Sequence, residues 1–147
     1  MIGNDTNFFQ GTFIGNGHSI YADINYPNTQ FVGLFNRIEG GGGVYSLTVV
    51  GNVRGDNNVG GIVGIFNGNQ GNGQIINCIN NANIYGGDTI GGIAGIIYGG
   101  GDFSNLKNAG TIQSINEKEE PFGEPGLNQS IIGGIAGYVE GPYSSGL

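Results

Sequence analysis

The chain has 147 residues, enough for one domain with a modest core, and combines 33 glycines with only 10% charged residues. Hydrophobic residues make up 37% and recur periodically, which excludes a disordered chain, and the lack of a strict Gly-X-Y period excludes collagen. The formal net charge of −7 argues against nucleic acid or an anionic lipid surface as a partner, and no apolar run approaches the roughly 20 residues of a transmembrane helix.

The first 30 residues predict an N-terminal coil. Two short apolar runs flank residues 15–17 (GNG), a turn signal because Gly and Asn adopt left-handed backbone angles at little cost. His18, the only histidine, follows this turn and is expected to serve it, since a zinc peptidase motif needs a second histidine. Residues 20–25 then alternate apolar and polar side chains, as in a half-buried strand that ends before Pro27.

A six-residue motif rich in glycine recurs along the chain. It reads VGGIVG at residues 59–64 and IGGIAG at both 90–95 and 132–137, with a degenerate copy, FVGLFN, at 31–36. The starts of these copies lie 28, 31 and 42 residues apart. A period near 30 residues is typical of stacked supersecondary units, none of which can bury its apolar face alone.

A second block follows the motif and carries the clearest strand signal. Residues 44–53, 75–84 and 103–112 align without gaps, and from the fourth position onward like residues recur at every second place, as in strands with one face inward. The aligned columns are Val44/Ile75/Phe103, Leu47/Cys78/Leu106, Val49/Asn80/Asn108, Gly51/Ala82/Gly110 and Val53/Ile84/Ile112. Stacking places Asn80 over Asn108, so we expect these two inward amides to satisfy each other by hydrogen bonding along the axis.

No segment has helical length or an apolar i, i+3, i+4 stripe, so crossover helices are not expected. We therefore predict an all-β fold, a right-handed parallel β-helix (β-solenoid) of about four coils with roughly 28–31 residues per repeat. Residues 1–147 would form a single domain with an N-terminal coil (1–30), three repeats (31–58, 59–89 and 90–131) and a partial repeat (132–147). Residues 117–130 are polar and contain two prolines, and they predict a loop insertion that accounts for the longest spacing.

The Gly-Gly-Ile segments are predicted as strands, and two phases fit them. We assign the columns Ile62/Ile93/Ile135 and Phe66/Ile97/Val139 inward. The opposite phase, Val63/Ala94/Ala136, is also apolar, so a one-residue slip would reverse the two faces. The glycine column Gly64/Gly95/Gly137 suits a tight cross-section. Cys78 is the only cysteine, cannot form an internal disulfide, and is expected to be a small buried hydrophobe.

Candidate functional residues are few. Four carboxylates gather in the predicted loop and are the candidates for binding calcium or a partner: Glu117, Glu119, Glu120 and Glu124. Their spacing matches no calcium-binding loop, so a solvated loop is the preferred interpretation and no cofactor is expected. The other carboxylates lie mostly beside turns and do not stack into a pair, so glycoside hydrolysis is not expected.

The motif and the aligned block together resemble the GLUG-repeat proteins. Their motif is a Gly, a large aliphatic residue, a variable residue and a Gly, followed by an Ile-x-Asn-Cys-like strand. Residues 61–64, 92–95 and 134–137 match the first part, and residues 75–78 (IINC) match the second. The resemblance covers nearly the whole chain apart from the loop. It implies a repeat from a large bacterial surface or secreted protein, such as adhesin-like proteins and the non-catalytic parts of immunoglobulin A peptidases.

The resemblance implies a non-catalytic structural or adhesive module, extracellular or at the cell surface, because the motif itself carries no catalytic residue. Residues 1–5 have neither a charged start nor an apolar stretch, so we expect the secretion signal of the parent protein to lie outside this chain. The expected partner is a protein or glycan ligand, or other copies of the chain through open coil ends, without membrane insertion. The alternatives are a head-to-tail fibre subunit and a glycan-binding module that uses exposed Tyr and Asn, whereas a carbohydrate-active enzyme ranks last.

Overall fold

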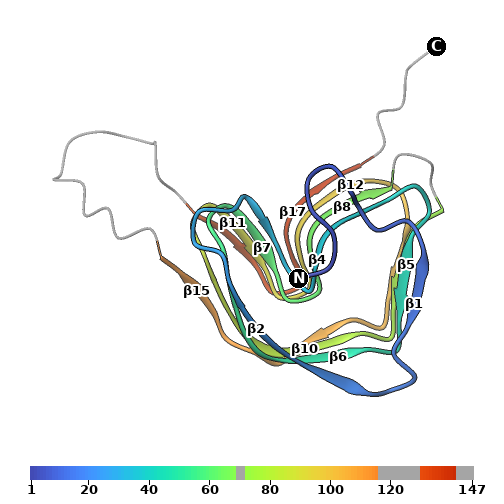
Figure 1. Cartoon of the computed structure of the whole chain (residues 1–147), viewed down its shortest axis with the longest axis horizontal. Coiled ribbons are helices and arrows are strands. Elements are labelled where there is room, and N and C mark those ends of the chain that lie inside the picture. Colours follow the sequence, from blue (N-terminus) through green and yellow to red (C-terminus); the bar gives the residue numbers. More distant parts are fainter. Residues whose placement is uncertain (69–71, 116–129, 142–147) are drawn as a thin grey trace, which may run out of the picture.

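Figure 1 shows a computed structural model of the chain, which describes residues 1–68, 72–115 and 130–141. Every strand pair in these residues is parallel, and the strands of successive coils lie one above another in four sheets. The chain makes about three complete turns, so that each sheet receives strands from four layers. The predicted all-β parallel β-solenoid is confirmed. The described residues contain no helix, and hence none long and apolar enough to cross a membrane.

We number the sheets in the order in which the chain first visits them. The first contains β1 (Thr12–Ile14), β5 (Gly43–Tyr45), β9 (Gln74–Ile76) and β13 (Asp102–Ser104), and the second contains β2 (Ser19–Asn25), β6 (Thr48–Arg54), β10 (Ile79–Gly86), β14 (Lys107–Asn108) and β15 (Ile112–Ser114). The third contains β3 (Phe31–Val32), β7 (Asn58–Gly60), β11 (Thr89–Gly91) and β16 (Ile131–Gly133), and the fourth contains β4 (Phe35–Glu39), β8 (Val63–Gly68), β12 (Ala94–Gly99) and β17 (Ala136–Glu140).

The second sheet confirms the predicted columns. Its register places Val49 of β6 between Ile20 of β2 and Asn80 of β10, and Asn80 pairs in turn with Asn108 of β14. Buried and outward positions alternate along these strands, because successive side chains of a strand point to opposite faces. The apolar side chains of the strands therefore point into the solenoid, where those of successive coils pack against one another.

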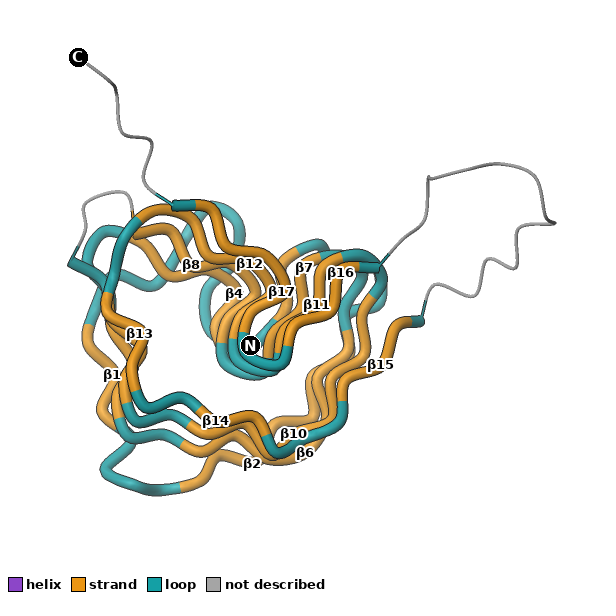
Figure 2. Tube along the Cα trace, turned by 180° about the vertical axis from the view of Figure 1, so that it is seen from behind, coloured by secondary structure: helices purple, strands orange, loops and turns teal. Residues whose placement is uncertain are grey.

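The glycine-rich motif forms a corner, not the continuous strand that its pattern predicts. β7 ends at Gly60, residues 61–62 bend, and β8 begins at Val63. Ile62 and Val63 are both completely buried, because the bend turns two consecutive side chains into the core. Ile62 belongs to one of the two predicted inward phases and Val63 to the other, so both phases are buried at the corner. Figure 2 shows that the third and fourth sheets meet at this corner, beside the N-terminus. The corner indents the cross-section of the solenoid.

Glycines just after the corner allow the backbones of the third and fourth sheets to come into direct contact. A Cβ on Gly64 would lie 2.5 Å from the Val32 nitrogen of β3, and one on Gly95 would lie 2.6 Å from the Asn58 carbonyl carbon of β7. No side chain fits at such separations, so these positions require glycine. The tight cross-section predicted for this column is confirmed, and its cause is the contact between the two sheets.

The degenerate copy of the motif is one residue shorter than the others. Val32 pairs with Val59 and Phe35 with Val63, so the paired positions lie three residues apart in the first coil and four apart in the second. The alignment of Phe31 with Val59 that the sequence pattern indicates is therefore wrong by one place. A single glycine turns the first corner where the later coils use two.

The two ends of the solenoid differ in how their cores are covered. At the N-terminal end, Phe9 packs on Phe35 with ring centroids 4.8 Å apart and forms an isolated bridge with Ile38. In the last coil, Val139 pairs with Ile97 in the column assigned inward, yet it is 60% exposed, compared with 4% for Ile97. The inward assignment is confirmed for Ile97, and Val139 is exposed because no coil of the described residues lies beyond it.

Candidate functional site: the outer face of the second sheet

The outer face of the second sheet brings polar side chains from successive coils into register. Outward positions alternate with inward ones along β2, β6 and β10, so side chains two residues apart share this face. Two adjacent columns result: Asp23/Asn52/Asn83 and Asn25/Arg54/Tyr85. Neighbours within a column are separated by the spacing of paired strands, about 4.8 Å.

A pocket of about 200 Å³ lies between these two columns. Its lining residues are Asp23, Ile24, Asn25, Asn52, Arg54 and Tyr85. The first three come from β2, the next two from β6 and the tyrosine from β10. The pocket therefore spans three coils and forms only when the coils are stacked in this register.

An axial hydrogen-bonded ladder fixes one wall of the pocket. Asn83 Nδ2 donates to Asn52 Oδ1 at 3.2 Å, and the Thr111 hydroxyl donates to Asn83 Oδ1 at 2.7 Å. The bond from Asn83 points the side-chain oxygen of Asn52 toward the next coil, so the N–H groups of the Asn52 amide point the other way and can donate to a ligand. The ladder links three coils and holds the Asn52 amide in one orientation.

The pocket combines a carboxylate, a guanidinium, two amides and a phenol. Asp23 and Arg54 are both exposed, and among the described residues the structure gives neither of them an ion pair. A carboxylate only accepts hydrogen bonds, whereas a guanidinium only donates them, so the two groups complement a ligand that does both. Hydroxyl groups are such ligands.

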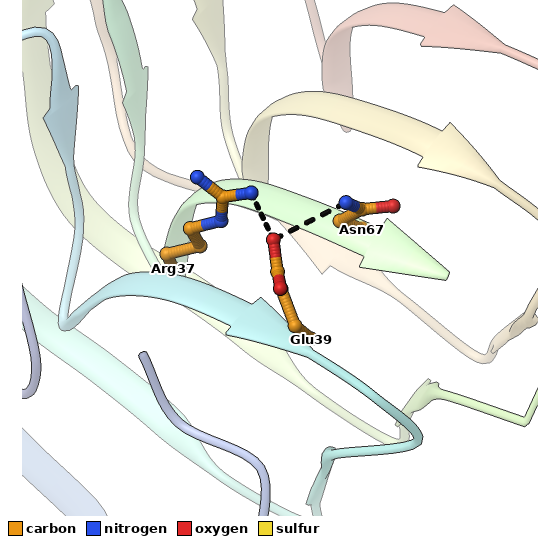
Figure 3. A network of polar contacts seen from close by, with 3 residues as sticks. All are labelled: Arg37, Glu39 and Asn67. Carbon is orange, nitrogen blue, oxygen red and sulfur yellow. Dashed lines mark hydrogen bonds and ion pairs between the residues drawn. The ribbon is translucent and has the colours of Figure 1, made fainter. Parts of the chain in front are cut away.

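Figure 3 shows a second polar cluster, which lies on the fourth sheet. Arg37 forms an ion pair with Glu39, two residues further along β4, and Asn67 Nδ2 of β8 donates to Glu39 Oε1 at 3.2 Å. The Arg37 guanidinium also lies 5.5 Å from the centroid of the Phe8 ring. These groups bind one another across the first two coils, so we assign the cluster a structural role.

Cys78 lies in the core, as its column predicts. It is fully buried, and its Sγ donates to Ile76 O at 3.3 Å and to Val44 O at 3.6 Å. Burial raises the pKa of the Cys78 thiol above its ordinary value of 9.0, and this effect outweighs the backbone hydrogen bonds of Leu47, Ile76 and Ser46, which lower the pKa. The thiol is therefore a packing group and not a nucleophile.

The four loop carboxylates that the sequence singles out lie outside the described residues: Glu117, Glu119, Glu120 and Glu124. The residues on either side of the insertion show where it leaves the solenoid. β15 ends at Ser114, β16 begins at Ile131, and the Ser114 and Ser130 hydroxyl oxygens are 2.6 Å apart.

His18 donates its backbone N–H to Gly15 O at 2.9 Å and so closes the predicted turn. Within the described ranges, no three His, Cys, Asp or Glu side chains gather as they would around a metal ion.

The sequence pattern misses the pocket although it contains most of the needed signal. The aligned blocks 44–53 and 75–84 end one residue before Arg54 and Tyr85, which share the next outward column. The polar positions between the inward columns were the relevant signal, because stacking turns them into continuous outer columns. Extending the alignment by one residue and including residues 20–25 places these residues in two adjacent outer columns, but it does not single them out as the lining of a pocket.

The outer face of the second sheet is suited to binding a ligand that has many hydrogen-bonding groups. This face holds donors and acceptors in fixed positions on a sheet, with the aromatic ring of Tyr85 beside them. No protein-family model, curated protein or solved structure matches the chain. The function is therefore inferred from the residues and geometry of the outer face and from the motifs of the chain.

Proposed function

We propose that this chain is a non-catalytic structural and adhesive repeat module of a bacterial cell-surface or secreted protein. The observation that carries the proposal is the polar outer face of the second sheet, where Asn52, Asn83 and Thr111 of three coils form one hydrogen-bonded column. The resemblance of residues 61–64 and 75–78 to GLUG repeats supports the surface or secreted setting.

Stacked coils suit an adhesive role because they make a binding face rigid before any ligand arrives. The outer side chains stand on strands that pair with the coil above or below, and the ladder restricts their rotamers further. A preorganised face loses little conformational entropy on binding, which favours affinity. A ligand with repeated units could also contact several coils at once, and linked contacts of this kind strengthen one another.

Binding of the purified chain to arrays of glycans and extracellular-matrix proteins tests the proposal. We expect the wild type to bind at least one ligand and Asn83→Ala to weaken that binding about tenfold, because the central link of the ladder is lost. Gln74→Ala, which removes an amide from β9 of the first sheet, is the matched control and should bind like the wild type. Binding to no ligand, or conversion of a bound glycan to products, would overturn the proposal.

A second candidate function, a self-associating fibre subunit, is favoured by the surface of the last coil. Ile132 and Val139 are 51% and 60% exposed, whereas Ile90 and Ile97 in the same columns are 0% and 4% exposed. Among the described residues, β16 and β17 are the outermost strands of their sheets, and an apolar surface beside such an edge favours pairing with another chain, here a second copy. Light scattering over a concentration series distinguishes such a subunit from a module that stays monomeric.

A further inference from the structure

We propose that the pocket between β2, β6 and β10 binds one ring of a neutral saccharide through a pair of adjacent hydroxyl groups. This inference rests on the adhesive function proposed above and names its ligand class. The pocket volume of about 200 Å³ is below the roughly 300–1,000 Å³ of sites for drug-sized molecules, so it suits a single ring. Its charged lining residues are exposed, so the rest of a glycan chain can extend into solvent.

The polar groups of the pocket match what two adjacent hydroxyls need. Each hydroxyl donates one hydrogen bond and accepts others. The Asp23 carboxylate can accept from both hydroxyls, while the Arg54 guanidinium and the Asn52 amide donate to their oxygens. The Asn52 amide is already oriented for this role, because its oxygen accepts from Asn83 Nδ2 at 3.2 Å.

Tyr85 supplies the apolar part of the site. It stands beside Arg54 in the next coil and is half-buried, so its ring is held in place at the edge of the pocket. The C–H groups of a sugar ring form an apolar face that packs against an aromatic ring. Tyr21 lies on the same outer face but does not line the pocket and is 71% exposed, so it provides a matched control.

The charges of the pocket and of the chain favour a neutral sugar over an acidic one. A ligand carboxylate that reached Arg54 would also lie near Asp23, and like charges at close range repel. The formal net charge of −7 adds a long-range repulsion of polyanionic glycans. Asp23 instead strengthens the binding of neutral hydroxyl groups, because hydrogen bonds to a charged acceptor are stronger than those to a neutral one.

Titration with monosaccharides, followed by ligand-observed NMR and calorimetry, tests the inference. The panel contains the neutral sugars glucose, galactose and mannose and the acidic sugars glucuronic acid and N-acetylneuraminic acid. We expect a Kd of about 1 mM for a neutral sugar, as befits one ring in an open site. Tyr85→Ala and Asp23→Asn should each raise the Kd about tenfold, whereas Tyr85→Phe should retain binding because it keeps the ring.

Two control variants separate the pocket from the rest of the surface. Tyr21→Ala removes a tyrosine from the same face, and Asp102→Asn removes a carboxylate from β13, so both should bind sugar like the wild type. Tighter binding of an acidic sugar, unchanged binding by Tyr85→Ala, or no saturation at ten times the expected Kd would each overturn the inference. If array binding survives while the pocket variants change nothing, the adhesive proposal stands and only the pocket assignment fails.

Discussion

Asn80 Nδ2 donates a hydrogen bond to Asn108 Oδ1 at 2.8 Å inside the solenoid, and so links two successive coils through their interior. Each amide also bonds to the backbone of its own coil, since Asn80 Oδ1 accepts from the Ala82 nitrogen at 3.1 Å and Asn108 Nδ2 donates to Gly110 O at 3.2 Å. Asn80 is completely buried, so these bonds replace the water that the amide loses on folding.

Replacing Asn80 should therefore cost much more than replacing its exposed neighbour. Asn80→Ala leaves the Ala82 N–H without its acceptor and removes the donor to Asn108, and we expect the free energy of unfolding to fall by about 2–3 kcal/mol. Asn81→Ala, at an exposed position of the same strand, should change it by less than about 0.5 kcal/mol. Equal effects of the two variants in urea denaturation would contradict this account of the ladder.

The contact between Asn80 and Asn108 could be predicted from the sequence because it depends only on repeat spacing and strand period. Aligning residues 75–84 with 103–112 fixes the partner of every residue, and the period of two fixes which side chains point inward. The corner at residues 61–62 could not be predicted in this way. Its flanking residues are apolar in both phases, and a bend buries both, so the alternation that identifies a strand is lost.

Within the described part of the chain, the second glycine of the motif is tightly surrounded in one coil and has open space beside it in the next. A methyl group on Gly92 would overlap the Gly134 carbonyl oxygen and the Asn108 side chain, whereas one on Gly134 would meet no atom of the described residues within 4 Å. The two glycines occupy the same place in successive motifs, and neither has a positive φ. Gly92→Ala should therefore lower the free energy of unfolding by about 3 kcal/mol, because the packed coils cannot move apart cheaply.

Gly134→Ala is the matched control, and its stability should equal or slightly exceed that of the wild type, since alanine reduces the freedom of the unfolded chain. Thermal unfolding followed by circular dichroism measures both variants under the same conditions. A large loss in Gly134→Ala, or none in Gly92→Ala, would show that backbone conformation and not space determines glycine at this place.

Burial of Cys78 predicts both low reactivity and a particular pH dependence. A thiol reagent should label the folded chain only after unfolding, because the side chain is completely buried. The raised pKa of the folded thiol means that its contribution to stability is complete below pH 9 and is lost as the pH rises through the folded pKa. The stability advantage of the wild type over Cys78→Ala should therefore shrink above pH 9, as measured by urea denaturation across pH. A constant difference would contradict the burial of the thiol.

The pocket shows where prediction from the sequence stops. Asp23, Arg54 and Tyr85 are different residue types in three coils, so no repeated residue marks the site. Its lining depends on two adjacent outward columns at once, and therefore on the register of the whole second sheet. Repetition identifies the inward columns because packing selects similar side chains there, whereas an outer face is free to vary from coil to coil.

Self-association through the last coil predicts a particle size that grows with protein concentration. Four stacked layers at about 4.8 Å give a rise of roughly 20 Å per copy, which electron microscopy of any filaments can measure. Val139→Asp places a charge on the exposed apolar surface and should reduce the association at least tenfold, because burying an unpaired charge is costly. Val50→Asp, the same change on the outer face of β6, should leave it unchanged. A monomer at every concentration would rule out the fibre subunit and direct the search for ligands to the outer face.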